Sequence, residues 1–295
     1  MTALLQIIEL EKQYKNVNAV NGINFSVEKG ACFGILGPNG AGKTTTIEVI
    51  EDVIPPTSGK ILYKGEPRTL SFREEVGIQF QNTALFSFLT VRETLNTFKS
   101  LYHNTYDLDE LIHMCSLNGF IDQMNDRISG GQKQRFMLAL ALINKPELIF
   151  LDEPSTGLDP QSRRNLWDVI RGIKKIGKTI ILTTHYMEEA QILCDDIAIM
   201  DHGKIIAQGS PDALIKNYSR EVTVILPKKS IEGHQIKNLP LAISESQDQI
   251  KIKTDDINGC LETLIASHIN LKDMSVRSPN LENVFLTLTG RQLRE

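Results

Sequence analysis

The sequence lacks the features that mark several classes of protein. Its four cysteines are widely scattered and include no CxxC pair, so it predicts neither a zinc site nor a disulfide framework. The longest apolar run, Phe136 to Ile143, is far shorter than the about 20 residues of a membrane-spanning helix. The first residues carry no basic segment and no long apolar stretch, so we expect no signal peptide.

An excess of positive charge is also missing. The formal net charge is −4 at pH 7, whereas proteins that bind nucleic acids are usually basic, so we expect no nucleic-acid partner. With 295 residues, 41% of them apolar, the chain can bury one large core or two smaller ones. These features predict a cytoplasmic protein that needs a partner for any work in a membrane.

Short apolar runs alternate with helical patterns over the first two thirds of the chain, as in an α/β domain. Runs of four or five apolar residues predict strands of a parallel sheet buried on both faces: Cys32–Leu36, Leu148–Leu151, Ile180–Thr183 and Ile197–Met200. Residues 197–209 predict a hairpin that turns at 201–204, where Gly203 can take a positive φ. Residues 82–146 are largely helical and include the capping box Thr90–Glu93, so we expect a helical insertion between two strands.

The composition changes after Lys216. We therefore predict a first domain over residues 1–216 and a small C-terminal α/β domain over 217–295. Within the second domain we expect two strands and two helices, at 222–226, 249–253, 261–265 and 280–293.

Residues 37–45, GPNGAGKTT, match the phosphate-binding loop pattern GxxxxGK followed by Ser or Thr. The glycines let backbone N–H groups turn toward phosphate oxygens, Lys43 reaches the β- and γ-phosphates, and Thr44 offers its hydroxyl to Mg²⁺. A glycine turn followed by a chance lysine is the alternative, but a predicted strand precedes the motif and a helical run over 45–53 follows it. The predicted nucleotide ligands are Gly37, Pro38, Asn39, Gly40, Ala41, Gly42, Lys43, Thr44 and Thr45.

A second motif, LIFLDE (148–153), supplies two carboxylates at the end of a buried strand. Asp152 would hold Mg²⁺ directly or through water, and Glu153 would orient or deprotonate the attacking water. A pair of solvated acids at a strand end is common, but beside a P-loop the metal and catalytic roles are favoured.

Residues 128–132, ISGGQ, allow two interpretations. Ser129 and Gln132 satisfy the capping box that begins many helices. Two glycines in a first turn cost about 1 kcal/mol each relative to alanine. A helix cap does not need these glycines, whereas a backbone that approaches a phosphate closely does. The segment resembles the signature motif of ABC-type ATPases, with Ile128 where leucine is usual. The resemblance implies that the nucleotide is contacted by Ser129, Gly130, Gly131 and Gln132.

Further segments resemble this family. The resemblance implies that Gln81 contacts the metal and the attacking water, that His185 contacts the γ-phosphate and that Tyr14 stacks on adenine. Residues 155–159, STGLD, resemble the D-loop of the dimer interface, which adds Asp159 to the nucleotide site. Alone these signals are weak, because a lone glutamine is usually a surface residue, a lone histidine structural, and Tyr14 as easily a core aromatic. The implied catalytic residues are Glu153, His185 and Gln81, and the implied metal ligands are Thr44, Gln81 and Asp152.

The resemblance covers residues 1–216 and implies an α/β P-loop NTPase core of the ABC ATPase type, with a helical insertion and an antiparallel β part. It also implies ATP and Mg²⁺ as cofactors and a homodimer that closes head-to-tail over two ATP molecules. Residues 144–147, NKPE, resemble the guanine-reading NKxD of GTPases, but they end in Glu and precede the Asp152 strand. We interpret them as a loop and expect adenine rather than guanine.

Residues 278–295 and 157–187 resemble the daunorubicin-resistance type of ABC-2 exporters. This implies a separate ABC-2 type permease, a peripheral position on the inner face of the cell membrane, and export of a drug, lipid or similar apolar compound. Residues 84–91, ALFSFLTV, lie where such ATPases receive a helix of the permease, although packing inside the helical insertion is as plausible. No physical feature of residues 217–295 indicates the role of that domain.

A soluble ABC-type ATPase that regulates translation or DNA maintenance is the alternative function. Translation ATPases of this type usually carry two cassettes, whereas this chain has one P-loop. DNA-maintenance ATPases separate their two ATP motifs by a long coiled coil, and no sustained heptads lie between Lys43 and Asp152. Co-purification with a multi-span membrane protein would discriminate between the two classes.

Overall fold

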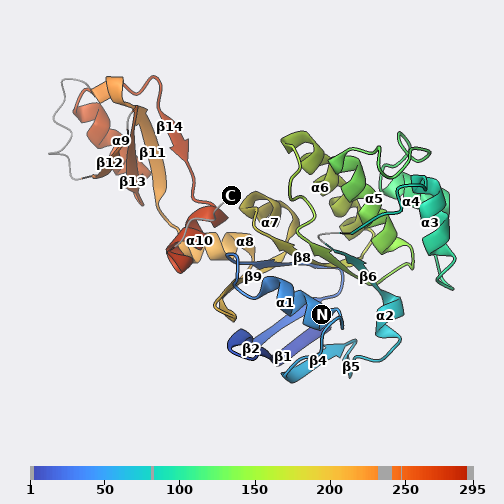
Figure 1. The fold of residues 1–295 in the computed structure, drawn as a ribbon. Helices are drawn as coiled ribbons and strands as arrows, with labels where there is room; N and C mark the ends of the chain where they lie inside the picture. The colour runs from blue at the N-terminus through green and yellow to red at the C-terminus, as the bar shows by residue number, and fades with distance from the viewer. Residues whose placement is uncertain (1–2, 81–82, 232–240, 247, 291–295) are drawn as a thin grey trace. The chain divides into compact units, whose positions relative to one another are not determined.

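The computed structural model describes residues 3–80, 83–231, 241–246 and 248–290. The chain divides into two compact units, the first extending to Pro211 and the second beginning at Asp212. This division lies a few residues before the composition change at Lys216. Each unit is described below by itself (Figure 1).

A six-stranded sheet forms the centre of the first unit, in the order β10-β9-β3-β8-β7-β6 (Figure 1). Its strands are β3 (Cys32–Leu36), β6 (Val76–Gln79), β7 (Leu148–Asp152), β8 (Thr179–Thr184), β9 (Asp196–Asp201) and β10 (Lys204–Gly209). The β3, β7 and β8 strands are buried almost throughout, which confirms the parallel sheet predicted from the continuous apolar runs. The predicted hairpin is also present, since β9 and β10 pair antiparallel with Asp201 opposite Lys204, and Gly203 has φ +75°.

A second, antiparallel sheet of the first unit has the order β2-β1-β4-β5. Its strands are β1 (Ala3–Tyr14), β2 (Val17–Glu28), β4 (Ser58–Tyr63) and β5 (Glu66–Pro67). The sequence predicted an antiparallel part without locating it. β1 and β2 are a long hairpin in which Tyr14 pairs with Val17, and a register shift between Ile7 and Leu10 interrupts the alternation that would have identified β1 as a strand.

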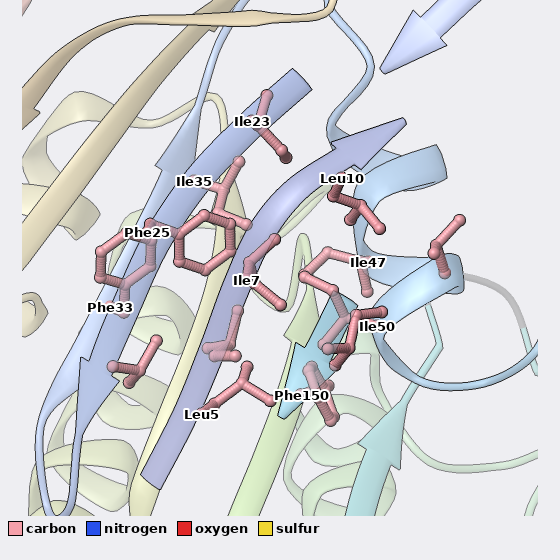
Figure 2. Close-up of a cluster of buried hydrophobic side chains, with 14 of the residues drawn as sticks. Leu5, Ile7, Leu10, Ile23, Phe25, Phe33, Ile35, Ile47, Ile50 and Phe150 are labelled. Atoms are coloured by element: carbon pink, nitrogen blue, oxygen red, sulfur yellow. The ribbon is translucent and has the colours of Figure 1, made fainter. Parts of the chain in front are cut away.

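A hydrophobic core joins the two sheets around α1 (Lys43–Ile50), as Figure 2 shows. Ile47 and Ile50 of this helix lie among side chains of β1 and near Phe150 of β7. The rings of Phe25 and Phe33 stack with centroids 4.8 Å apart. Because α1 follows the P-loop directly, this packing holds the loop against both sheets. The helix begins two residues earlier and ends three residues earlier than the predicted run 45–53.

The remaining helices of the first unit are α2 (Phe72–Glu75), α3 (Val91–Lys99), α4 (Leu108–Met114), α5 (Gly130–Leu142), α6 (Pro160–Lys175) and α7 (Met187–Leu193). The segment with α3, α4 and α5 lies between the neighbouring strands β6 and β7, which confirms a helical insertion. The predicted capping box is present, with Thr90 and Glu93 bonded reciprocally at the start of α3. The α5, α6 and α7 helices cover the face of the large sheet opposite α1 (Figure 1).

The second unit carries its own sheet, in the order β12-β13-β11-β14, and its own hydrophobic core. Its elements are α8 (Pro211–Tyr218), β11 (Val222–Pro227), the 3₁₀ helix η1 (Lys228–Ile231), β12 (Ala242–Glu245), β13 (Gln249–Thr254), α9 (Ile257–Ala266), β14 (Ser275–Arg277) and α10 (Leu281–Thr289). Both predicted strands are present. The helix predicted over 280–293 ends at Thr289, because Gly290 adopts a left-handed φ of +63° that closes it; residues 291–293 lie outside the described part.

No helix within the described ranges is long and apolar enough to span a bilayer. The four cysteines are buried and free, so the structure carries no disulfide among them.

We expect Phe33→Ala to lower the free energy of unfolding by about 3–5 kcal/mol, because it removes a buried ring that stacks on Phe25. Urea denaturation of the full chain, followed by the fluorescence of Trp167 in the first unit, measures the loss. Leu70→Ala is the control, since Leu70 is 83% exposed and its truncation should change stability by no more than about 0.5 kcal/mol. Equal effects of the two substitutions would contradict the assigned core.

Candidate functional site

Three parallel strands end side by side at one edge of the large sheet. β3 pairs with β8 and β8 pairs with β7, so that Leu36 lies opposite Thr184 and Thr183 lies opposite Asp152. The P-loop follows β3, Glu153 follows β7 and His185 follows β8. The carboxyl ends of parallel strands are where α/β proteins bind ligands. Gln81 follows β6, the next strand, but lies outside the described residues.

The P-loop is pressed between two hairpins, and its glycines are required there. A Cβ on Gly42, which has φ +102°, would lie 2.2 Å from the carbonyl oxygen of Ala19 in β2. A Cβ on Gly37 would lie 2.4 Å from the carbonyl oxygen of Met200 in β9. The N–H of Gly203, at the turn between β9 and β10, donates to the Ala41 carbonyl at 3.0 Å. The curled backbone of the loop is therefore held by the fold.

Lys43 is folded back onto this loop. Its Nζ donates hydrogen bonds to the carbonyl oxygens of Gly37 and Pro38, at 2.8 and 3.2 Å, and the side chain is 6% exposed. Burial lowers the pKa of Lys43, while the charges of Glu153 and Asp152 oppose that shift. The ammonium group thus lies close enough to the two carboxylates to interact with them electrostatically.

The start of α1 is open to an anion. No side chain caps the helix at Gly42, and its first turn, which contains Thr44 and Thr45, has no acidic residue. The first N–H groups of a helix carry partial positive charge, which favours a negatively charged ligand at this end.

The strand β7 delivers Asp152 and Glu153 in different environments. The Thr183 hydroxyl donates to Asp152 Oδ1, and burial raises the pKa of the Asp152 carboxyl. Glu153 has φ +47°, an uncommon conformation for a non-glycine residue, and its N–H donates to the Thr183 carbonyl at 3.1 Å. Thr183 therefore braces the carboxylate of Asp152 and the backbone of Glu153. Its position in the run TTH, which ends at His185, is the one sequence signal that points to this role.

Glu153 and His185 are paired. His185 Nδ1 lies 3.2 Å from Glu153 Oε2, and the Thr156 hydroxyl donates to the same oxygen at 3.1 Å. The hydrogen bond with His185 lowers the pKa of Glu153, and burial only partly opposes it. The carboxylate is therefore held ionised beside the imidazole. Two residues that the sequence placed in one site are in contact here.

Tyr14 lies on the hairpin that touches the P-loop. It pairs with Val17 at the end of β1, and Ala19, two residues further along β2, is the residue that approaches Gly42. The Tyr14 side chain is 44% exposed, with Lys12 Nζ 5.2 Å from its ring centroid. An exposed ring next to the loop is available for a ligand, and the interpretation of Tyr14 as a core aromatic is wrong.

The segment 128–132 begins α5 through a capping box. The N–H of Gln132 donates to Ser129 Oγ at 3.3 Å, and the N–H of Ser129 donates to Gln132 Oε1 at 2.8 Å. A Cβ on Gly131 would lie 2.7 Å from the side chain of Ser162 in α6, whereas Gly130 has no neighbour closer than 3.7 Å. Packing therefore accounts for Gly131 and leaves Gly130 unexplained. Within the described part of the chain, no hydrogen bond or ion pair joins this segment to the P-loop.

The Asp159 carboxylate caps a helix of its own chain. Its Oδ1 accepts hydrogen bonds from the N–H groups of Gln161 and Ser162, both at 3.0 Å, and so caps α6. The hydrogen bonds from Ser162 lower the pKa of the Asp159 carboxyl. The structure does not bring this carboxylate to the P-loop of its own chain through any hydrogen bond among the described residues.

Comparison with known proteins identifies the family. The family model described as ABC transporter matches residues 20–156. A linearmycin resistance ATP-binding protein of Bacillus subtilis is 35% identical over 311 residues, which cover 99% of this chain and 100% of the relative. A Nod factor export ATP-binding protein I of Burkholderia orbicola is 37% identical over 306 residues, covering 97% of each chain.

Solved structures agree on the fold. The cbiO1 protein of Clostridium perfringens, part of the ABC transporter complex cbiONQ, matches with a TM-score of 0.67 and 29% identity, covering 74% of this chain and 92% of that one. Another ATP-binding subunit of an ABC transporter matches with a TM-score of 0.64 and 28% identity, covering 73% of this chain and 93% of that one. The predicted ABC-type P-loop fold is thereby confirmed. The chain belongs to the ATP-binding proteins of ABC transporters, and it binds and hydrolyses ATP.

One buried acid near this site makes stability depend on pH. Glu51, at the end of α1, is 4% exposed, and its Oε1 has no hydrogen-bond partner among the described residues. Burial, together with the charges of Asp152 and Glu48, raises its pKa from 4.5 to about 8. The folded protein therefore keeps a proton that the unfolded chain releases, so stability falls as the pH rises between these two values.

We expect Glu51→Gln to remove this pH-dependent contribution to stability. The melting temperature of the variant, relative to the native protein, should rise as the pH increases from about 4.5 to about 8. Melting curves recorded across this range without nucleotide measure the difference, and Glu66→Gln, on an exposed position of β5, is the control. A constant difference between Glu51→Gln and the native protein across the range would contradict the assignment.

Proposed function

We propose that this chain is the ATP-hydrolysing subunit of an ABC-2 type exporter, working as a head-to-tail homodimer with a separate membrane permease. One observation carries the enzymatic part of the proposal. The carboxyl ends of β3, β7 and β8 bring Lys43, Asp152, Glu153 and His185 to one edge of the sheet, where the start of α1 is open to an anion.

The P-loop would hold the phosphates of ATP. The γ- and β-phosphate oxygens are stronger acceptors than the two carbonyls that Lys43 now contacts, so its Nζ would move to them. The backbone N–H groups of residues 37–45 and the start of α1 add donors. Tyr14, exposed on the adjacent hairpin, would stack on adenine.

The oxygen donors at this edge suit Mg²⁺. Among the described residues no group of three or more His, Cys, Asp or Glu side chains could hold a metal, so the protein offers no complete cage. Mg²⁺ commonly takes one or two carboxylates together with substrate phosphates and water, which the Asp152 carboxylate and the Thr44 hydroxyl fit. Gln81 would complete the set. The ion would neutralise charge on the phosphates.

Glu153 would act on the attacking water. Because its pKa is lowered, it is a weak base, and we propose that it orients the water and accepts a proton only as the bond to phosphorus forms. His185, 3.2 Å from its carboxylate, would hold Glu153 in place and contact the γ-phosphate. The brace from Thr183 keeps the loop after β7 from moving away.

The signature segment supports a dimer. In its own chain the start of α5 makes no hydrogen bond to the P-loop among the described residues, yet it presents a helix N-terminus and the unobstructed Gly130. A γ-phosphate bound by a second copy would satisfy this end. ATP would then favour the closed dimer, and hydrolysis would weaken the attraction and open it.

Export through a permease rests on three observations. The relatives named above carry the words resistance and export in their names. The segments 157–187 and 278–295 resemble those of ABC-2 drug exporters. Phe86 and Phe88, beyond β6, are 53% and 72% exposed with their ring centroids 5.7 Å apart, and such an exposed aromatic pair favours docking of a partner helix. We propose a drug, lipid or similar apolar compound as cargo and the inner face of the membrane as the location.

We expect Glu153→Gln to lower the turnover number for ATP by about 10²–10⁴, as for loss of a base that orients water. ATP binding should persist, because Lys43 and the P-loop are unchanged. Lys43→Ala should instead weaken the binding of a fluorescent ATP analogue, measured by equilibrium titration. Near-normal hydrolysis by Glu153→Gln would contradict the role proposed for this residue.

We expect the full-length protein, expressed with an affinity tag in its native host, to co-purify with a multi-span membrane protein. Phe86→Ser combined with Phe88→Ser should reduce the co-purified amount without changing ATP binding by the isolated chain. Leu101→Ser is the matched control, because Leu101 is 70% exposed on another part of the helical insertion. Recovery without any membrane protein would contradict the transporter assignment.

A further inference from the structure

A buried glutamate connects the two segments that carry Glu153 and His185. Glu189 lies on α7 and is 0% exposed. Its Oε1 accepts a hydrogen bond from the hydroxyl of Ser155, in the loop after β7, and a second from Trp167 Nε1 of α6 at 2.9 Å. One carboxyl group thus joins α6, α7 and the loop that follows Glu153.

The environment of this carboxyl group disfavours its ionised form. Its Oε2 is buried without a hydrogen-bond partner among the described residues. Burial raises the pKa of Glu189, and interactions with Ser155, Thr184 and Trp167 only partly oppose this shift. An apolar side chain would fill the same space without losing hydration. An apolar side chain could not accept hydrogen bonds from Ser155 and Trp167. Both of these donors are themselves buried.

The bond between Glu189 and Ser155 lies only a few residues along the chain from Glu153 and from His185. Ser155 is two residues after Glu153, and Glu189 is four residues after His185. The pair Glu153–His185 spans 3.2 Å between the same two segments. Because Glu153 adopts the uncommon φ of +47°, the loop that follows it has to be held from outside. Thr183 braces the start of this loop, and Glu189 holds its next turn.

We propose that Glu189 is a positioning residue for ATP hydrolysis, whose carboxyl group fixes Ser155 against α7 and thereby sets the distance between Glu153 and His185. The inference rests on the roles proposed above for those two residues. The Glu189 carboxyl group is bonded to Ser155, two residues after Glu153, and the effect on hydrolysis that we propose passes through this bond.

The chain contains a spectroscopic probe of this contact. Trp167 is its single tryptophan, it is 3% exposed, and its indole N–H is bonded to Glu189. The emission of the native protein therefore reports whether the Glu189 carboxyl is in place. Loss of Ser155 alone leaves the bond to Trp167 intact, so emission separates the two contacts.

The test compares four variants of the full chain: Glu189→Ala, Glu189→Gln, Ser155→Ala and the double variant Glu189→Ala with Ser155→Ala. We expect Glu189→Ala and Ser155→Ala each to lower kcat by about 10- to 100-fold, since small displacements of catalytic groups carry such losses, with KM for ATP within about threefold. Glu189→Gln keeps an acceptor for both donors and should recover most of the rate. The double variant should lose no more than Glu189→Ala alone, because both substitutions break one connection.

Controls separate positioning from folding. Activity is counted per site that binds a fluorescent ATP analogue, and Glu188→Ala, the adjacent exposed position on α7, should leave kcat unchanged. Trp167 emission should change in Glu189→Ala and stay native in Ser155→Ala. If Glu189→Ala fails to fold, Ser155→Ala and Glu189→Gln still decide the question, because both preserve volume closely.

Three outcomes would overturn the inference: an unchanged kcat per binding site in Ser155→Ala, additive losses in the double variant, or a Glu189→Gln rate as low as that of Glu189→Ala. Each of these can occur while Glu153→Gln is inactive, in which case only the role of Glu189 fails. Near-normal turnover by Glu153→Gln would instead remove the proposed site roles on which the inference depends.

Discussion

The in-register pairing of β3, β8 and β7 is the constraint on which the site depends. Parallel strands end where their shared ladder ends, so the chain segments that leave them emerge at one level. The glycine-rich loop, the two acids and the histidine come from positions far apart in the sequence, and this ladder alone brings them to one edge. The apolar packing of α1 between the sheets then keeps the loop from moving relative to that edge (Figure 2).

Backbone conformation at this edge is held by neighbours rather than by preference. Gly37 and Gly42 lie where a Cβ would collide with the carbonyls of β9 and β2, and Glu153 carries a positive φ beside Thr183. Such conformations persist where surrounding structure over-determines them. The antiparallel hairpins β1–β2 and β9–β10, which pack against the P-loop, therefore shape the site proposed for the phosphates.

Much of this arrangement could be predicted from patterns in single segments. The continuously apolar strands, the P-loop and the capping boxes at Thr90 and Ser129 depend on local rules, and the structure has them where the sequence indicated. β1 was not located because its register shifts break the alternation that identifies half-buried strands. The hydrogen bonds of Glu189 with Ser155 and Trp167 join residues 34 and 22 positions apart, so no local sequence pattern predicts them.

The signature segment shows how one motif can satisfy two demands. Its serine and glutamine cap α5, and one of its glycines is needed for the approach of α6, so a single chain is complete without a ligand at this end. Because the cap uses side-chain oxygens and leaves Gly130 uncovered, the helix end can still face an external phosphate. In the head-to-tail dimer proposed above, this helix end would meet a nucleotide held by the P-loop of a second copy. A segment that is complete within one chain is therefore compatible with the proposed role of the same segment in a dimer.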